Sequence, residues 1–341
     1  MAERERIVKE LGLPPDCRIY WVKRIVYPKV KSTKLCLFEG TSIVIDDETE
    51  ELVCAVRFNP YKQMHPDLFA KFEDFISIVG KHAEAWNGQQ GTNGSMKCEE
   101  AHGDMFLEGW HAGYNNGIGC PRCSQTVKSK LISVNHGPRS TQTSLSENTS
   151  DSLVQVIFAG GVCFHAFESN SIKGRQNNVP CFSNPKWKDT PNSLVWASSL
   201  SVTQDEFQNK AHKDQDFSSF AFGFFSHVIC SSWKIYKKAD NPALDNVQGA
   251  TFMIDDYNTE IFFDECDGVV EIIWQADINH HSTESTTHTP EGTRIDAKVA
   301  SVTHFGCSAQ ISKKLVNKIN AIELIKRNMN LEEWQHCGIC R

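Results

Sequence analysis

The pattern of apolar and polar positions predicts a hairpin and several helices in the first half of the chain. Residues 41–58 alternate apolar and polar positions on both sides of an acidic turn, which is typical of a β-hairpin. Apolar residues recur with helical spacing over 66–79, so we expect a helix there that ends at Gly80. Similar patterns predict further helices at 104–114 and at about 152–167.

From residue 193 onward the pattern changes to short apolar runs separated by turn residues, which favours a β-sandwich or barrel. The runs are 194–200, 220–228, 250–253, 261–263, 269–274 and 304–311. A last apolar repeat predicts a helix over about 312–327. We therefore expect an α+β protein in which a helical N-terminal part packs on a C-terminal β-core.

The composition is that of a folded protein with an acidic balance. The 341 residues are 40% hydrophobic and 23% charged, which excludes wholesale disorder. The net charge of −7 excludes a protein that binds nucleic acid through its overall charge. The first residues are strongly charged and no run of about 18 apolar residues occurs, so we expect no secretory signal and no membrane partner. The 13 cysteines are then expected to be reduced thiols of an intracellular protein.

Basic residues gather in two strips that contain no acidic residue. The first strip lies between Asp16 and Glu39, and the second lies between Glu108 and Glu147. Either the strips hold a phosphate backbone, or acids elsewhere in the fold neutralise them. Their basic residues are Arg18, Lys23, Arg24, Lys29, Lys31 and Lys34 in the first strip, and Arg122, Lys128, Lys130 and Arg139 in the second.

Two Cys-x-x-Cys pairs could together form a Cys₄ zinc site. They are Cys120 with Cys123, and Cys337 with Cys340. The alternative is coincidence, because a chain with 13 cysteines forms such pairs easily. Zinc at these residues would tie the C-terminal tail to the second basic strip.

A His-x-Asp pair and a distant second histidine are the ligands that a mononuclear non-haem iron needs. The pair occurs three times, beginning at His65, His102 and His212. The first two pairs precede predicted helices, where Asp is favoured at the helix start, so capping explains them without a metal. His212 with Asp214 lies instead between strand-like runs of the second half. This third pair is therefore the candidate for iron.

Two adjacent histidines and an arginine complete the candidate iron centre. His280 and His281 follow the apolar run 269–274, and Arg294 lies 14 residues beyond His280. An arginine can bind the far carboxylate of a 2-oxo acid through two parallel hydrogen bonds. The alternative is a set of ordinary polar loop residues.

Several segments resemble the TET/JBP dioxygenases, and in particular the fungal branch of that family. Residues 207–225 are similar to the family's first metal-ligand segment, in which N-x-x-H-x-D-x-D precedes an aromatic strand. Residues 268–283 are similar to its distal-histidine segment, and 303–311 to its closing strand. Residues 109–114 resemble a helix that precedes the core. The resemblance covers roughly 105–315.

This resemblance implies a double-stranded β-helix, a jelly-roll or cupin-like fold, with flanking helices. We expect an N-terminal helical and hairpin extension at 1–190 and the dioxygenase core at 191–315. A C-terminal helix and a Cys-containing tail are expected at 316–341.

The resemblance also implies that Fe(II) binds His212, Asp214 and a distal histidine. His280 is favoured over His281, because counting from His280 keeps two hydroxyl residues in the family's His-x-Thr-Thr phrase. Arg294 is expected to hold 2-oxoglutarate, although His304 occupies the place where the family usually carries this arginine.

The activity implied by the resemblance is an Fe(II)- and 2-oxoglutarate-dependent dioxygenase that uses O₂ to oxidise the methyl group of a modified base. The favoured substrate is 5-methylcytosine in double-stranded DNA, and the base must flip out of the duplex. A nuclear location follows from that substrate. The residues expected near the base or the backbone are Asn209, Asp216, Lys23, Arg24, Lys128 and Lys130.

Three alternatives stay open at this point. The enzyme could remove the methyl group of N6-methyladenine in DNA or RNA. The chain could be a catalytically inactive DNA-binding module. Asp216 is either near the pocket or a solvated turn acid.

Overall fold

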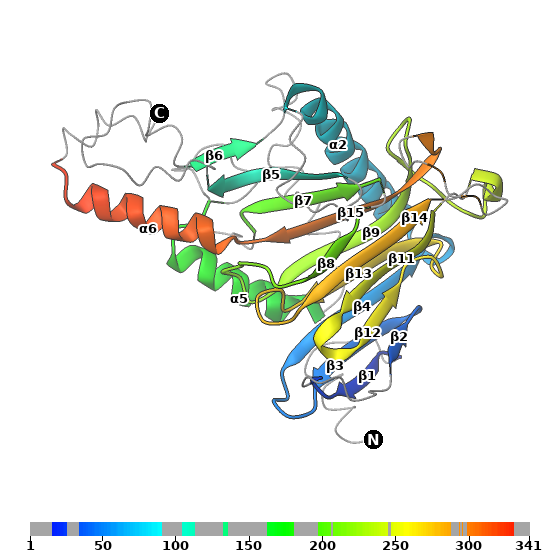
Figure 1. Ribbon diagram of the computed structural model, residues 1–341, viewed down its shortest axis with the longest axis horizontal. Helices are drawn as coiled ribbons and strands as arrows, with labels where there is room; N and C mark the ends of the chain where they lie inside the picture. The colour runs from blue at the N-terminus through cyan, green and yellow to red at the C-terminus, as the bar shows by residue number, and fades with distance from the viewer. Residues whose placement is uncertain are drawn as a thin grey trace.

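The computed structural model consists of two packed β-sheets, with helices on one of them (Figure 1). The structure describes residues 16–25, 34–90, 104–112, 132–135, 162–180, 197–205, 207–244, 247–287, 293, 295 and 299–330. Within these ranges, no helix is both long and apolar enough to cross a membrane.

The larger sheet has ten strands, in the order β1-β3-β4-β13-β9-β15-β7-β5-β6, with β10 paired to β9. These strands are β1 Arg18–Val22, β3 Thr41–Asp46, β4 Leu52–Pro60, β13 Gly268–Trp274, β9 Ala221–Ile229, β15 Val302–Gln310, β7 Ser199–Gln204, β5 Asp104–Ala112, β6 Ile132–Asn135 and β10 Lys234–Ile235. The smaller sheet has five strands, in the order β2-β12-β11-β14-β8. They are β2 Leu35–Leu37, β12 Thr259–Phe262, β11 Val247–Ile254, β14 His281–Thr287 and β8 Asn209–His212.

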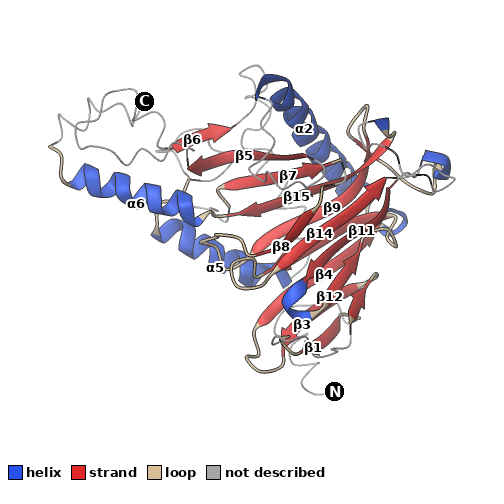
Figure 2. Ribbon diagram, viewed as in Figure 1, coloured by secondary structure: helices blue, strands red, loops and turns tan. Residues whose placement is uncertain are grey.

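Three α-helices contribute apolar residues to the outer side of the larger sheet (Figure 2). The helices are α2 Pro66–Gln90, α5 Val162–Gln176 and α6 Lys313–Arg327. Short 3₁₀ turns are η1 Tyr61–Gln63, η3 Pro242–Leu244 and η4 Asp255–Tyr257.

Eight of the strands form a double-stranded β-helix, and this confirms the expected fold. Strands β7, β15, β9 and β13 are neighbours in the larger sheet, and β8, β14, β11 and β12 are neighbours in the smaller one. The chain crosses between the sheets as it passes from β7 to β8 and on to β9, and again from β12 through β13 and β14 to β15. Strands distant in sequence therefore become neighbours, as a jelly roll requires.

Strand β9 shows how the larger sheet separates two apolar cores. Phe224 packs in the outer core, with its ring centroid 5.7 Å from that of Phe72 and 5.5 Å from that of Phe75, both on α2. The next residue, Phe225, lies in the inner core between the sheets, where it stacks on Phe263 at 4.5 Å. Because alternate residues of a strand face opposite sides, one strand supplies both cores.

The predicted hairpin and terminal helix are confirmed, and α2 is longer than its pattern indicated. Strands β3 and β4 pair as the hairpin, and α6 lies where the last helix was expected. Helix α2 continues past Gly80, because this glycine leaves room for the ring of Trp233 rather than ending the helix. A Cβ atom at Gly80 would lie 2.2 Å from the ring of Trp233.

Residues 104–112 form strand β5, so the helix predicted at 104–114 is wrong. Strand β5 pairs antiparallel with β7, in a register that places Asp104 opposite Gln204. A short apolar run does not distinguish a helix from a strand, and here the backbone partners offered by β7 decide. The capping explanation for the second His-x-Asp pair therefore fails, because Asp104 begins a strand; His102 lies outside the described residues.

Two further expectations concern the N-terminal part. Helix α5 is described from Val162, and residues 151–161 lie outside the described part of the chain, so the expected start near 152 stays a prediction. The described residues before 190 supply strands β1 to β6, so this part is richer in strands than its pattern indicated. Because most of these strands join the same sheet as the core, backbone hydrogen bonds link the two parts. The domain limits at 190 and 315 stay a prediction.

Candidate metal centre

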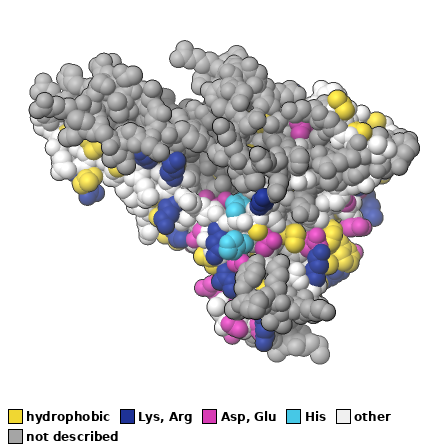
Figure 3. Space-filling view, in the orientation of Figure 1, with side chains coloured by type: hydrophobic (Ala, Val, Ile, Leu, Met, Phe, Trp, Pro, Cys, Tyr) yellow, Lys and Arg dark blue, Asp and Glu magenta, His cyan; other side chains and the backbone are white. Residues whose placement is uncertain are grey.

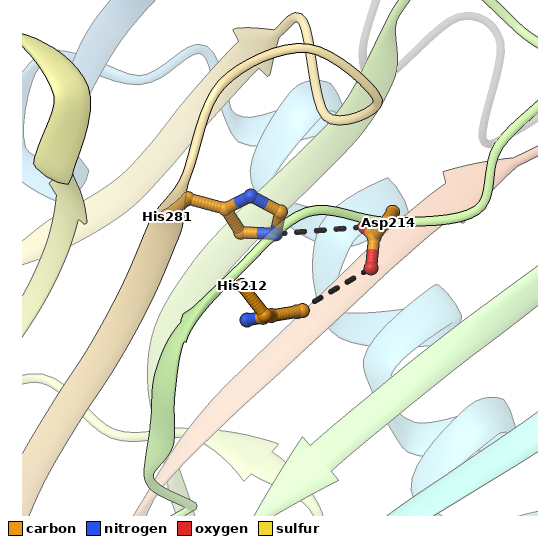
Figure 4. Close-up of side chains that lie close together, drawn as sticks. All are labelled: His212, Asp214 and His281. Atoms are coloured by element: carbon orange, nitrogen blue, oxygen red, sulfur yellow. Dashed lines mark ion pairs between the residues drawn. The ribbon is translucent and has the colours of Figure 1, made fainter.

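Three side chains with metal-binding atoms come together where β8 ends and β14 begins (Figure 4). His212 is the last residue of β8 and His281 is the first residue of β14, and the two lie opposite each other in the antiparallel pair. Asp214 follows β8 by two residues, held by a 2.9 Å bond from its backbone N–H to the carbonyl oxygen of Ala276. One ligand atom from each of the three lies within 4.8 Å of the others.

The carboxylate of Asp214 bridges the two imidazole rings, whose centroids are 4.4 Å apart. Its Oδ1 is 3.4 Å from Nε2 of His212, and its Oδ2 is 3.5 Å from Nε2 of His281. The side chain of His281 is buried, whereas those of His212 and Asp214 are 30% and 26% exposed. The cluster is therefore closed toward the interior and open on one side.

Backbone carbonyl oxygens orient both histidines. Nδ1 of His212 lies 2.8 Å from the carbonyl oxygen of Lys210, and Nδ1 of His281 lies 3.3 Å from that of Asn279. A carbonyl oxygen only accepts, so each Nδ1 carries a proton, and each Nε2 is left facing the carboxylate of Asp214, where a metal ion can replace the Nε2 proton. Metal-binding histidines are commonly held in this way. In addition, the amide of Asn209 is 3.0 Å from Nε2 of His212, so Asn209 supports the site.

Electrostatics favour an ionised Asp214. Burial raises its pKa, but the hydrogen bonds and charges of His212 and His281 outweigh burial and hold the pKa well below its usual range. For His212, burial lowers the pKa, and the hydrogen bond and charge of Asp214 more than compensate, so its pKa is raised. A metal ion that binds here meets a carboxylate that is already ionised.

His280 does not join this cluster, so the preference for His280 over His281 was wrong. Its Nδ1 lies 2.9 Å from Oδ1 of Asp256, and its backbone N–H donates to Oδ2 of the same carboxylate at 3.2 Å. Consecutive residues of an extended chain point to opposite sides, and the inward side falls to His281. His281 packs there against the rings of Phe252 and Trp274.

His304, the alternative anchor for 2-oxoglutarate, lies in the inner core. Its ring stacks on Phe263 at 5.1 Å and on Phe225 at 5.9 Å, and 6% of the residue is exposed. Burial lowers its pKa to about 4, so it is neutral near pH 7 and offers no positive charge to a carboxylate. Arg294 lies outside the described residues.

Asp216 is buried near the centre and is not a solvated turn acid. Burial, followed by the charges of Asp214 and Asp277, raises its pKa well above the usual range. Its backbone forms a β-bridge with Ser312, just before α6. Among the described residues its Oδ2 has no hydrogen-bond partner.

The described members of the first basic strip all pair with acids from other segments. Arg18 pairs with Glu39, Lys23 with Asp47, Arg24 with Asp256, and Lys34 with Glu260. Neutralisation by acids elsewhere in the fold is thus the observed outcome for these four. Lys29, Lys31, every basic residue of the second strip including Lys128 and Lys130, and the cysteines Cys120, Cys123, Cys337 and Cys340 lie outside the described residues.

The first His-x-Asp pair spans the start of α2, as the capping explanation predicts. Nδ1 of His65 is 3.6 Å from Oδ2 of Asp67, and both side chains are more than 70% exposed. This pair lies at the exposed start of α2 and lacks a second histidine in the described residues around it.

The residues of the cluster fit Fe(II). Two neutral imidazole nitrogens and one carboxylate that leave a side open are the donor set of the non-haem iron oxygenases. Buried polar atoms without partners in the described part of the chain lie beside it, namely Nε1 of Trp274, Oγ1 of Thr283 and Oδ1 of Asn209. Such atoms suit a polar ligand that enters between the sheets.

Comparison with known families decides the class of protein. The model of the Tet-like 2OG-Fe(II) oxygenase superfamily matches residues 70–285, a segment that contains all three cluster residues. The chain belongs to this superfamily. It is therefore an oxygenase that uses Fe(II), 2-oxoglutarate and O₂. A search of the curated proteins finds no match.

Sequence reasoning missed the residues that hold the distal histidine in place. Asp255 and Asp256 bind residues more than 20 positions further along the chain, and the side chain of Asn279 binds Arg24 from the N-terminal segment. In the sequence they resemble ordinary turn residues, and no local pattern marks them. Trp274 was recognised only as the end of an apolar run.

Proposed function

We propose that the protein oxidises the methyl group of 5-methylcytosine in double-stranded DNA, after the base has flipped out of the duplex. The observation that carries the proposal is the cluster of His212, Asp214 and His281 with one open side, in a chain of the Tet-like superfamily. A base inside the stack cannot reach a centre that lies between two sheets, so flipping is required. A nuclear location follows from this substrate.

In this proposal His212, Asp214 and His281 bind Fe(II), and the carbonyl oxygens behind the two histidines keep Nε2 directed at the metal. Bound Fe(II) and 2-oxoglutarate supply the O₂-dependent oxidation of the methyl group. The N–H of Trp274 and the hydroxyl of Thr283 are available donors for the 2-oxo acid, because both are buried without described partners.

Arg294 is the proposed partner of the far carboxylate of 2-oxoglutarate. A guanidinium stays charged under all ordinary conditions and binds a carboxylate through two parallel bonds. The rival residue His304 is neutral in its buried place, because its pKa is about 4. The chemistry therefore favours Arg294.

Lysines near the centre support an anionic substrate. Burial raises the pKa of Asp277, and the charges of Lys173, Lys313 and Lys213 oppose that rise. Lys173 lies on α5, Lys313 lies at the start of α6, and Lys213 lies between the ligands His212 and Asp214. Asp277 is the residue after Ala276, whose carbonyl oxygen binds the backbone N–H of Asp214. Three lysine charges therefore lie around Asp277, close to the metal centre.

The surface view agrees with this distribution of charge. Figure 3 shows histidine side chains on a face where Lys and Arg lie on both sides of them. Lys213 and Lys313 are exposed, so their charges are available to a phosphate backbone. In this proposal local lysines hold the DNA near the centre, although the net charge of the chain is −7. Lys23 and Arg24 already pair with acids, and in this proposal they do not contribute to DNA binding.

The direct test is a product assay. Purified protein is incubated with Fe(II), ascorbate, 2-oxoglutarate and duplex DNA that carries 5-methylcytosine, and the digested nucleosides are analysed by mass spectrometry. We expect hydroxymethylcytosine and further oxidised products. DNA and RNA that carry N6-methyladenine are assayed in parallel, and product from these alone would replace the proposed substrate.

A matched pair of variants separates the centre from an unrelated His-x-Asp pair. His212→Ala removes a proposed ligand and should abolish product formation. His65→Ala changes an exposed residue of the same sequence pattern and should leave product formation unchanged. Loss of product in His65→Ala, with folding intact, would contradict the assignment.

A further inference from the structure

The turn η4 holds the chain on both sides of His281. The carboxylate of Asp256 accepts bonds from the backbone N–H and Nδ1 of His280, at 3.2 and 2.9 Å. The carboxylate of Asp255 accepts a 2.9 Å bond from the hydroxyl of Ser282. The backbone N–H of Asp255 also donates to the carbonyl oxygen of His280 at 2.8 Å. The residues before and after the distal histidine are thus fixed to one turn.

The N-terminal segment in turn holds η4. The Nη2 atom of Arg24 lies 2.9 Å from Oδ2 of Asp256, 2.8 Å from the carbonyl oxygen of Ile278 and 3.0 Å from Oδ1 of Asn279. The backbone N–H of Ile25 donates to the carbonyl oxygen of Asp256 at 2.8 Å. Arg24 therefore joins the turn to the segment that leads into β14.

Asn279 connects this contact directly to the metal ligand. Its residue is fully buried, and its carbonyl oxygen accepts the Nδ1–H of His281 at 3.3 Å. A shift of Asn279 would release the bond that directs Nε2 of His281 toward Asp214. Arg24 binds the side chain of the same asparagine, so one guanidinium reaches two of the supports of His281.

We propose that Arg24 is a positioning residue of the metal centre, which acts through Asp256 and Asn279 to hold His281 in its metal-binding place. The family match begins at residue 70, so this residue lies outside the matched segment. Strand β1, which precedes it, is an edge strand of the larger sheet, whereas η4 lies between two strands of the smaller sheet. The inference rests on the metal centre of the proposed function and is independent of its DNA substrate.

The chemistry of arginine suits this role better than that of lysine. A guanidinium presents several donors in a fixed plane, whereas an ammonium is a single charged point on a flexible stem. The guanidinium of Arg24 also lies 5.7 Å from the ring centroid of Tyr257, which closes the turn from the other side. Support of this kind around a metal ligand typically changes metal affinity by about 10–100-fold.

The test is a titration of the metal-free protein with Co(II), which binds the same nitrogen and oxygen ligands as Fe(II) and has a visible spectrum. Arg24→Ala should weaken Co(II) binding by about tenfold and alter the spectrum of the bound ion. Arg24→Lys should lie between Arg24→Ala and the wild type. Arg18→Ala is the matched control, because Arg18 lies on the same segment and pairs with the exposed Glu39 rather than with η4.

A second variant guards against a change that merely unfolds the protein. Asp256→Asn keeps the size of the side chain and should weaken Co(II) binding in the same way. The double variant should lose less Co(II) affinity than the product of the fold-losses of the two single variants, because Arg24 and Asp256 support His281 through the same contact. The midpoint of thermal unfolding is measured for each variant without metal.

The outcomes separate this inference from the proposed function. If folded Arg24→Ala binds Co(II) as tightly as the wild type and with the same spectrum, the positioning role is overturned, even where the unfolding midpoint falls. If the folded wild type does not bind Co(II) at all, the metal centre and the inference fail together. If Co(II) binding weakens as expected but methylated DNA yields no product, the inference is supported and the proposed substrate is not.

Discussion

His212 and His281 face each other across β8 and β14, and each imidazole is oriented by the carbonyl oxygen of the residue two positions before it. The same short-range device is thus used twice, on two paired strands. Both Nε2 atoms meet the carboxylate of Asp214, at 3.4 and 3.5 Å. The centre is therefore assembled by backbone geometry before any metal arrives.

The first prediction distinguishes the two adjacent histidines. His281→Ala removes a ligand atom and should abolish Co(II) binding in an absorption titration. His280→Ala removes one bond to Asp256 but leaves the backbone N–H bond in place, so affinity should fall only a few-fold. If His280→Ala loses Co(II) binding while His281→Ala binds Co(II) fully, then His280 and not His281 is the metal ligand.

The second prediction concerns acid stability. An unfolded histidine takes up a proton as the pH falls through about 6.5, whereas folded His304 does so only near pH 4. The contribution of His304 to stability is therefore complete above pH 6.5 and is lost as the pH falls toward 4. It amounts to about 3 kcal/mol. His227, whose pKa burial also lowers, acts in the same direction.

The measurement is urea unfolding of the metal-free protein at several pH values between 7.5 and 4.5. His304→Gln keeps a polar side chain but cannot titrate, so its stability should fall less steeply with decreasing pH than that of the wild type. Parallel curves for the two proteins would show that His304 titrates normally and would contradict its neutral, buried state.

The third prediction is that replacing a helical glycine by alanine lowers the stability of this protein, whereas the same replacement usually raises stability. Alanine is favoured over glycine by about 1 kcal/mol within a helix. At Gly80, however, the new Cβ would lie 2.2 Å from the ring of Trp233, so Gly80→Ala should lower the free energy of unfolding by about 2 kcal/mol. In a Trp233→Leu background the same change should be neutral or stabilising. A stabilising effect with Trp233 present would mean that the ring moves aside without cost.

The fourth prediction concerns the contribution of lysines to DNA binding. The affinity for duplex DNA should fall steeply with salt, and replacing both Lys213 and Lys313 by Gln should reduce the slope of log affinity against log salt by about 2. The control is Lys62→Gln. Lys62 lies in η1, just after the end of β4, and that end of β4 pairs with Gly268 at the start of β13. The metal centre lies near the opposite end of β13. An equal reduction in the control would indicate a general effect of net charge.

The sequence predicted the metal centre because of context and not because of the motif itself. Three His-x-Asp pairs exist, and His212 was selected because it lies between runs of strand length. The two adjacent histidines could not be separated in the same way. A shift of one residue exchanges the two faces of a strand, and the contact with Asp256 that holds His280 elsewhere is invisible in the sequence.

The errors share a physical cause, which is pairing with distant segments. Residues 104–112 became a strand because β7 offered backbone partners far along the chain, such as Gln204, which lies opposite Asp104. The basic residues of the first strip looked unpaired in the sequence, but acids in and beside the smaller sheet, such as Glu260 and Asp256, pair with them. Gly80 was misread as a helix end because the ring of Trp233 comes from a turn far along the chain.

The contact between Arg24 and Asp256 also has a consequence for the order of folding. The two residues are 232 positions apart, and the ribosome needs roughly 10–50 s to synthesise a stretch of that length. During that time the guanidinium emerges without its carboxylate, and the support of His281 cannot form. The metal centre is thus completed only when a segment made long before meets the turn that has just emerged. Iron is therefore expected to be loaded after translation of the core rather than during it.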